Sequence, residues 1–188
     1  PIMALIFFLT VSYGGITTFL PLFAESLSVN AGLFFLIYAI MLTLIRPVAG
    51  IISDKYGETV VILPALAVTA SAMIVLAFSA GPVGIFAAAV LYGIGFGSAQ
   101  PSLQAAALHL ADPQRKGAAN ASFLTAFDLG IGLGSILLGA VSQLMGYSQL
   151  FLLSAFSIAI ALIIFTPIVG RMLKNQREKS GNESSANR

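Results

Sequence analysis

Hydrophobic residues gather in six long runs along the chain, and short polar joins separate these runs. Each run holds about 20 residues or more, the length that an α-helix needs to cross a bilayer. The last residues, 175–188, are polar and rich in Ser and Asn, so they lack the apolar side chains for a packed core. The pattern predicts an all-α membrane domain over 1–174, followed by a disordered tail. The six predicted spans are roughly 2–24, 31–53, 60–80, 84–109, 118–145 and 148–170.

Basic residues occur at alternate joins. The joins near 25–30, 80–84 and 146–149 contain no Lys or Arg. Because Lys and Arg beside a span favour the cytoplasmic side, we predict a multi-pass protein of the cell membrane. Both chain ends, and therefore the tail, are predicted to be cytoplasmic. The basic residues of the other joins are Lys55, Arg115, Lys116, Arg171, Lys174, Arg177 and Lys179.

The composition excludes several classes of protein. Charged residues make up 9% of the chain, whereas a soluble domain carries about a quarter. The chain contains no Cys, which excludes disulfide bonds and thiolate metal sites. Its one His, His109, has no other metal-binding side chain beside it, so we expect a solvated loop residue. We predict no metal, no cofactor and no nucleic-acid partner.

The most unusual polar stretch is 46–57, at the inner end of the second span. Asp54 falls in the last turn of the predicted helix, where a carboxylate meets the negative end of the helix dipole. It needs a nearby cation or the N-terminus of another helix. Gly57 can then turn the chain with a positive φ. Residues four positions apart lie on the same face of a helix. One face of this helix therefore carries Tyr38, Arg46, Gly50 and Asp54.

Arg46 lies in the inner half of the membrane, because it precedes Asp54 by about 12 Å at 1.5 Å per residue. Two fates are open to such a side chain. Its guanidinium can reach back to the interface, as Arg near a helix end commonly does. Alternatively, it can pair with a buried acid.

The first and fourth spans carry polar side chains that are candidates for a substrate path. In the first span these are Thr10, Tyr13 and Thr17, at spacings of three and four. In lipid a hydroxyl turns toward the bundle interior or a water-filled cavity, or else it bonds to its own helix backbone. In the fourth span the candidates on one face are Tyr92, Gln100 and Gln104.

Gln100 sits beside Pro101, where the helix loses a backbone hydrogen bond, so it is a candidate ligand contact. The alternative for Gln100 is a hydrogen bond between helices. On the next face of this span, Gly93 and Gly97 allow a neighbouring helix to approach closely.

Asp128 is the one acid in the middle of a predicted span, about 18 Å into the bilayer from Lys116. Small residues at helical spacing share its face and favour tight packing, so we expect Asp128 to point into protein. An acid at this depth is either protonated or paired with a cation such as Arg46. We predict a proton-coupling role, with a structural hydrogen bond as the alternative. The small residues of this face include Gly132, Ser135 and Gly139.

The spacing Gly50-x-x-x-Asp54-Lys55-x-Gly57 resembles the loop signature of the major facilitator superfamily, which joins the second and third helices of each six-helix half. The family pattern continues with basic residues, whereas Glu58 and Thr59 follow here. Other stretches strengthen the resemblance to the C-terminal half of a bacterial member. These are 19–23, 32–39, 93–101 and 128–139.

The resemblance implies two inverted three-helix repeats and transport by alternating access of two halves. It also implies that the first and fourth helices line the substrate path. The second and fifth helices would contact the other half, which we expect to be missing because the chain begins at Pro1 and enters a span at once.

The expected function is secondary active transport of a small molecule, with proton-coupled efflux of a drug or metabolite as the predicted subtype. A half-size transporter acting as a homodimer is the alternative. A membrane-embedded enzyme is disfavoured, because the sequence has no HExxH pair, no Gly-x-Ser-x-Gly and no acid pair at midplane.

Overall fold

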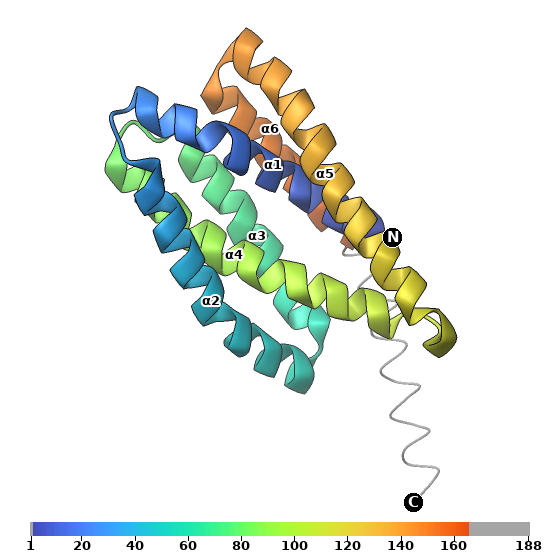
Figure 1. Ribbon diagram of the computed structural model, residues 1–188. Helices are drawn as coiled ribbons and strands as arrows, with labels where there is room; N and C mark the ends of the chain where they lie inside the picture. Colours follow the sequence, from blue (N-terminus) through green and yellow to red (C-terminus); the bar gives the residue numbers. More distant parts are fainter. Residues whose placement is uncertain (1, 166–188) are drawn as a thin grey trace, which may run out of the picture.

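The computed structural model describes residues 2–165, and this part of the chain is helical, without strands (Figure 1). Each predicted span corresponds to one helix, and the ends of the first five helices differ from the predicted ones by at most three residues. The predicted end of the sixth span, residue 170, lies outside the described residues. The basic residues Arg171, Lys174, Arg177 and Lys179, and the predicted tail, lie outside the described residues. The elements are α1 (Ile2–Ser26), α2 (Ala31–Tyr56), α3 (Glu58–Ala77), α4 (Pro82–His109), the 3-10 helix η1 (Pro113–Arg115), α5 (Lys116–Met145) and α6 (Tyr147–Ile164).

Tight turns separate consecutive helices. Gly57 has a φ of 96° and donates its backbone N–H to the carbonyl of Ser53, which ends α2 and lets α3 begin at once. Gly146 has a φ of 90° and joins α5 to α6 in the same way. Short connections of this kind reverse the chain, so consecutive helices cross the membrane in opposite directions.

The first helix of each half of the sequence packs mainly against helices of the other half. α1 packs mainly against α5 and α6, whereas α4 packs mainly against α2 and α3. Within each set of three consecutive helices the contacts are far fewer. The first helix of each set therefore lies among the second and third helices of the other set. This is the arrangement that two inverted three-helix repeats require, and the predicted fold class is confirmed.

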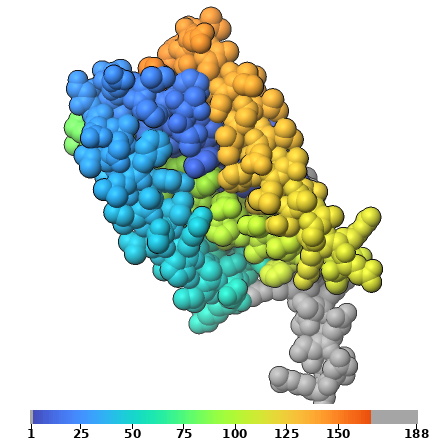
Figure 2. All heavy atoms as spheres, viewed as in Figure 1, coloured from blue at the N-terminus to red at the C-terminus, as the bar shows by residue number. Residues whose placement is uncertain are grey.

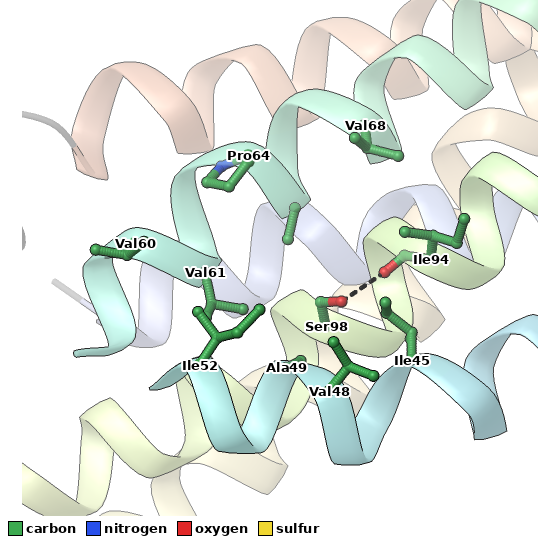
Figure 3. A pocket seen from close by; sticks show the side chains of 11 residues that line it. Ile45, Val48, Ala49, Ile52, Val60, Val61, Pro64, Val68, Ile94 and Ser98 are labelled. Atoms are coloured by element: carbon green, nitrogen blue, oxygen red, sulfur yellow. Dashed lines mark hydrogen bonds between the residues drawn. The ribbon is translucent and has the colours of Figure 1, made fainter. Parts of the chain in front are cut away.

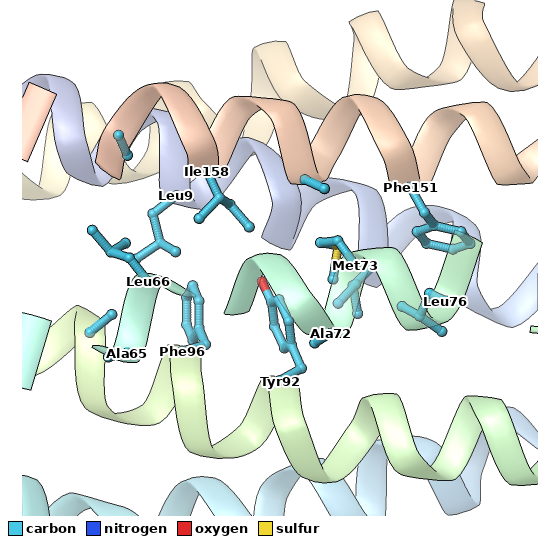
Figure 4. Close-up of a cluster of buried hydrophobic side chains, with 14 of the residues drawn as sticks. Leu9, Ala65, Leu66, Ala72, Met73, Leu76, Tyr92, Phe96, Phe151 and Ile158 are labelled. Carbon is cyan, nitrogen blue, oxygen red and sulfur yellow. The ribbon is translucent and has the colours of Figure 1, made fainter. Parts of the chain in front are cut away.

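The core is formed by α1, α3, α4 and α6, whose apolar side chains interlock (Figure 4). Tyr92 is fully buried there, and its hydroxyl lies 3.2 Å from the hydroxyl of Ser12 on α1. Ser157 of α6 donates to the backbone carbonyl of Phe8 at 2.7 Å. No buried side-chain nitrogen or oxygen among the described residues lacks a hydrogen-bond partner, as a membrane interior demands.

Glycines set the distance between the first helix of each repeat and its neighbours. A Cβ added to Gly93 of α4 would lie 2.8 Å from the backbone oxygen of Tyr38 on α2. A Cβ added to Gly134 of α5 would lie 2.7 Å from the Cα of Val11 on α1. The backbones of these helix pairs therefore approach as closely as in small-residue contacts of other membrane helices.

α2 and α5 differ from the other helices in how little of their surface this chain covers. In the most apolar part of each helix, 6% of the α2 residues and 17% of the α5 residues are buried, against 50–56% for α1, α3 and α4. Both helices lie in front of α1 and α4 in the view of Figure 1. This side of the molecule, with α2 and α5 at its edges, is called the open face below.

Candidate functional site

The open face has a floor and two walls. Figure 2 shows α2 on one side and α5 on the other, with atoms of α4 visible in the recess between them. The floor also includes α1, which packs beside α5. Most residues singled out in the sequence lie on these four helices, so the fold brings the candidate residues to one side of the molecule.

The exposed surface of α2 divides into two strips of different chemistry. At 100° per residue, one strip carries small or polar side chains and the other carries large aliphatic ones. The polar strip holds Gly32, Ala39, Thr43, Arg46, Gly50 and Asp54, all exposed. The aliphatic strip holds Leu33, Ile40, Leu44, Val48 and Ile51, all at least 45% exposed.

The exposed surface of α5 divides in the same way. Its exposed polar strip holds Thr125, Asp128 and Gly132. Ser135 and Gly139, further along the same stripe, are partly covered by α1, where Ser135 donates to the carbonyl of Gly14 at 3.3 Å. Its aliphatic strip holds Leu129, Leu133, Ile136 and Leu137. Lipid accepts large aliphatic side chains, whereas small and polar residues favour protein contact. Each of these helices therefore presents one strip suited to lipid and another suited to protein or to a polar cavity.

Aromatic rings cover the floor between the two walls. Tyr13 of α1 stacks on Phe96 of α4 with ring centres 4.9 Å apart. Phe127 of α5 approaches the same tyrosine at 6.3 Å. Tyr38 of α2 lies 5.7 Å from Tyr92, which in turn stacks on Phe96 at 5.4 Å. The rings thus form one continuous aromatic cluster from α2 to α5.

Two amides on α4 connect the floor to both walls. Arg46 of α2 donates from Nη2 to Oε1 of Gln100 at 3.4 Å. One turn further along α4, Nε2 of Gln104 donates to Oδ1 of Asn120 on α5 at 2.9 Å. Gln100 therefore makes the interhelical hydrogen bond that the sequence left as one of its alternatives. The sequence reasoning missed Asn120, because an isolated amide near a span end gives no periodic signal.

Asp128 is exposed among the described residues, so the prediction that it points into protein stays a prediction about the other half, which the resemblance places against the fifth helix. The stripe of α5 that packs on α1 is the neighbouring one, with Gly130 and Gly134 at its centre. Gly132 meets no heavy atom within 4 Å. Asp128 makes no hydrogen bond or ion pair with any described residue, including Arg46, and it lies on the polar strip of α5.

Two substrate-path candidates lie inside the bundle. Thr10 and Tyr92 have no exposed surface, so neither can touch a molecule outside the chain in this conformation. Thr10 donates to the carbonyl of Ile6 at 2.8 Å, and Thr17 donates to the carbonyl of Tyr13 at 2.9 Å. Both threonines thus bond to their own helix backbone. Tyr13, Thr17, Gln100 and Gln104 keep part of their surface exposed.

The loop signature at residues 50–57 lies at the C-terminal end of α2 and the turn to α3. Asp54 and Lys55 are exposed, and Nζ of Lys55 lies 5.2 Å from the centre of the Tyr56 ring. A Cβ added to Gly50 would meet nothing within 4 Å. Nothing within this chain therefore requires a glycine at position 50.

His109 differs from its prediction as a solvated loop residue. Its Nδ1 contacts Oε1 of Glu58, although the His side chain is 65% exposed. The contact joins the last residue of α4 to the first residue of α3, which are 51 positions apart. Such a distant pair leaves no signal in a single sequence.

A second hollow opens between α2, α3 and α4, with a volume of about 180 Å³ (Figure 3). Its walls are aliphatic, and the one hydroxyl in it, on Ser98, donates to the carbonyl of Ile94. This lining offers no site for a polar ligand. Within residues 2–165, no three His, Asp or Glu side chains gather where they could hold a metal ion.

Comparison with known proteins gives a consistent result. Residues 2–187 match the family model described as "Major Facilitator Superfamily". A relative from Staphylococcus aureus (strain Mu50 / ATCC 700699), named staphylopine export protein, is 27% identical over 163 residues, covering 82% of this chain and 40% of the relative. MFS-type transporters of Burkholderia mallei (strain SAVP1) and Burkholderia pseudomallei (strain 668) are each 27% identical over 175 residues, covering 93% of this chain and 42% of the relative.

The chain thus spans about two fifths of the length of the curated relatives that it matches. The family match extends over nearly all of the sequence, and the six helices are long and apolar enough to cross a membrane. The protein is a multi-pass membrane protein, and the chain belongs to the major facilitator superfamily.

Proposed function

We propose that this chain is the C-terminal half of a secondary active transporter that moves a small molecule across the cell membrane by alternating access. The observation that carries the proposal is the open face, where α2 and α5 each turn a small and polar strip away from their own bundle. Such strips are unfavourable against lipid and suit a second, similar half. The floor of α1 and α4 would then line a path between the halves.

The relatives support a missing partner rather than a second copy of this chain. Each is more than twice as long as the stretch that this chain matches. A homodimer of half-size chains remains the alternative, since a second copy would cover the same strips.

Export is the proposed direction, because the Staphylococcus aureus relative is named as an export protein. Protons are the proposed coupling ion, because Asp128 is an acid that lies within a membrane-spanning helix and faces the open side. A carboxyl at that depth can take up a proton in one conformation and release it in the other. Both ends of the chain are proposed to be cytoplasmic, with the loop 46–57 on the same side.

The test is transport by the complete protein in everted membrane vesicles that carry an imposed pH gradient, acidic inside. With staphylopine as the first probe, we expect accumulation inside the vesicles that stops when an ionophore collapses the gradient. Release of protons upon probe addition, followed with a pH-sensitive dye, is the second readout. Accumulation that ignores the gradient would remove proton coupling.

The molecular mass of the purified complete protein separates the two assemblies. A monomer with twelve spans supports the two-half proposal. A functional dimer of chains as short as this one would replace it with the homodimer.

A further inference from the structure

We propose that Arg46 anchors the carboxylate of an organic anion whose aromatic or apolar body lies along the aromatic cluster of the floor. The inference rests on the proposed transport function and names the substrate class of the same site. It starts from a charge that has no counterion among the described residues.

Arg46 is exposed on the polar strip of α2, within a membrane-spanning helix. Its polar contact is with Oε1 of Gln100, a neutral acceptor at the long distance of 3.4 Å. Among the described residues, no carboxylate lies within ion-pair distance of its guanidinium. A guanidinium does not lose its proton, so its charge remains within the membrane-spanning helix, where a carboxylate that enters the open face can pair with it.

Asp128 does not supply that anion in this structure, where it makes no contact with Arg46. The two groups also differ in chemistry. A carboxyl can become neutral by taking up a proton, whereas arginine stays charged in both conformations of a transport cycle. Arg46 therefore keeps its positive charge throughout the transport cycle, and a carboxylate ligand supplies a counterion for it.

The surroundings of Arg46 add a second requirement. Gln100 accepts from Arg46 through its oxygen, which leaves its amide N–H groups to donate to the same carboxylate. Phe96 lies one turn away on α4 and stacks on the half-buried ring of Tyr13. Phe127 lies on the α5 side of that ring. A flat apolar body attached to the carboxylate would lie against the half-buried rings of Tyr13 and Phe127, while the guanidinium binds both carboxylate oxygens.

The experiment uses a pair of probes with the same ring system, 2-naphthoate and its neutral amide 2-naphthamide. Binding of each to the purified complete protein is measured by equilibrium dialysis. The variants are Arg46→Gln, Arg46→Lys and Arg115→Gln, the last of which removes the same charge from η1, away from the open face. We expect Arg46→Gln to weaken naphthoate binding by about tenfold to a hundredfold, the range for a charge-assisted hydrogen bond.

Naphthamide binding is expected to stay unchanged in all three variants. Arg46→Lys should keep part of the naphthoate affinity, because it keeps the charge without the paired donors. An equal loss of affinity for both probes in Arg46→Gln would assign Arg46 a structural role and overturn the proposal. A second outcome would also overturn the proposal. In it, Arg46→Gln lowers the melting temperature of the ligand-free protein by several degrees and leaves naphthoate binding unchanged. The counterion of Arg46 would then be an acid of the other half.

Transport of the same probes separates this inference from the proposed function. Accumulation of naphthamide but not naphthoate overturns the anion anchor and leaves the transporter standing. Binding of naphthoate at Arg46, with no probe carried across the membrane, overturns the transport function and leaves the anchor standing. If naphthoate is neither bound nor transported, the proposal that Arg46 anchors an anion is rejected.

Discussion

α2 and α5 hold equivalent places in the two repeats, yet the charged residue within the membrane-spanning part of each helix differs in sign, Arg46 on α2 and Asp128 on α5. Each is the second helix of its repeat, each packs against the first helix of the other repeat, and each leaves most of its surface uncovered. α2 presents Arg46 to the open face, whereas α5 presents Asp128. The fold therefore places two similar helices around one floor, and single residues give the two walls different chemistry.

The difference matters because only one of the two charges can be switched off. Arginine remains a cation at any physiological pH, whereas a carboxyl has a neutral, protonated form. A permanent charge suits the binding of an anion, and a titratable charge suits coupling to protons. We therefore assign the ligand to the α2 wall and the proton to the α5 wall, and three changes test this division.

The largest effect is expected from Asp128→Asn in the complete protein. The amide cannot carry a proton between the two sides, so transport driven by a pH gradient should fall to the background level of empty vesicles. Exchange of labelled for unlabelled probe needs no net proton movement and should continue. Asp112→Asn, which removes an exposed acid at the start of η1, is the control. Normal gradient-driven transport by Asp128→Asn would take the proton away from the α5 wall.

A middle-sized effect should separate the packed stripe of α5 from its polar strip. Gly134→Ala places a methyl group 2.7 Å from the Cα of Val11 and should destabilise the fold by about 1–3 kcal/mol. Gly132→Ala meets nothing within 4 Å in this chain. In the folded isolated half, Gly134→Ala should lower the midpoint temperature of thermal unfolding, whereas Gly132→Ala should leave it unchanged. In the complete protein, loss of stability in Gly132→Ala as well would show that this strip contacts the other half.

The smallest effect is expected from Asp54→Asn, at the end of α2. A carboxylate that meets the N-terminus of a helix in the other half gains roughly 0.3–1 kcal/mol, so loss of the Asp54 charge should slow the exchange between conformations about twofold to fivefold. Turnover at saturating probe concentration measures this rate, and Asp54→Glu keeps the charge as a control. Equal turnover in both variants would reduce the loop 46–57 to a determinant of orientation.

The fold was largely predictable from the sequence, because a membrane permits few solutions. Long apolar runs have to be helices, and Gly57 marks a turn that only a positive φ can make so short. The partners of the helices were less accessible to local patterns. The resemblance supplied the inverted repeats, and the contacts of α1 with α5 and α6 gave them physical form.

The candidate site was predictable as a set of residues, but not as a set of contacts. Arg46 and Gln100 were both singled out, yet 54 positions separate them and nothing in either span indicated that they meet. The surroundings of Asp128 were not predictable from the sequence period alone, because α5 carries two neighbouring stripes of small residues. The inner stripe, with Gly130 and Gly134, is the one that α1 covers. A sequence period identifies a face of a helix, and only a neighbouring helix decides whether that face is buried.

The exchange of partners between the repeats has a consequence for biogenesis. α1 is synthesised before α5 and α6, the two helices against which it packs most, and its Ser12 meets Tyr92 only after 80 further residues have been made. The first three helices must therefore wait in the bilayer, or beside the insertion machinery, without their final neighbours. A ribosome that stops before α5 leaves α2, α3 and α4 able to pack on one another, but leaves α1 without the two helices against which it packs most.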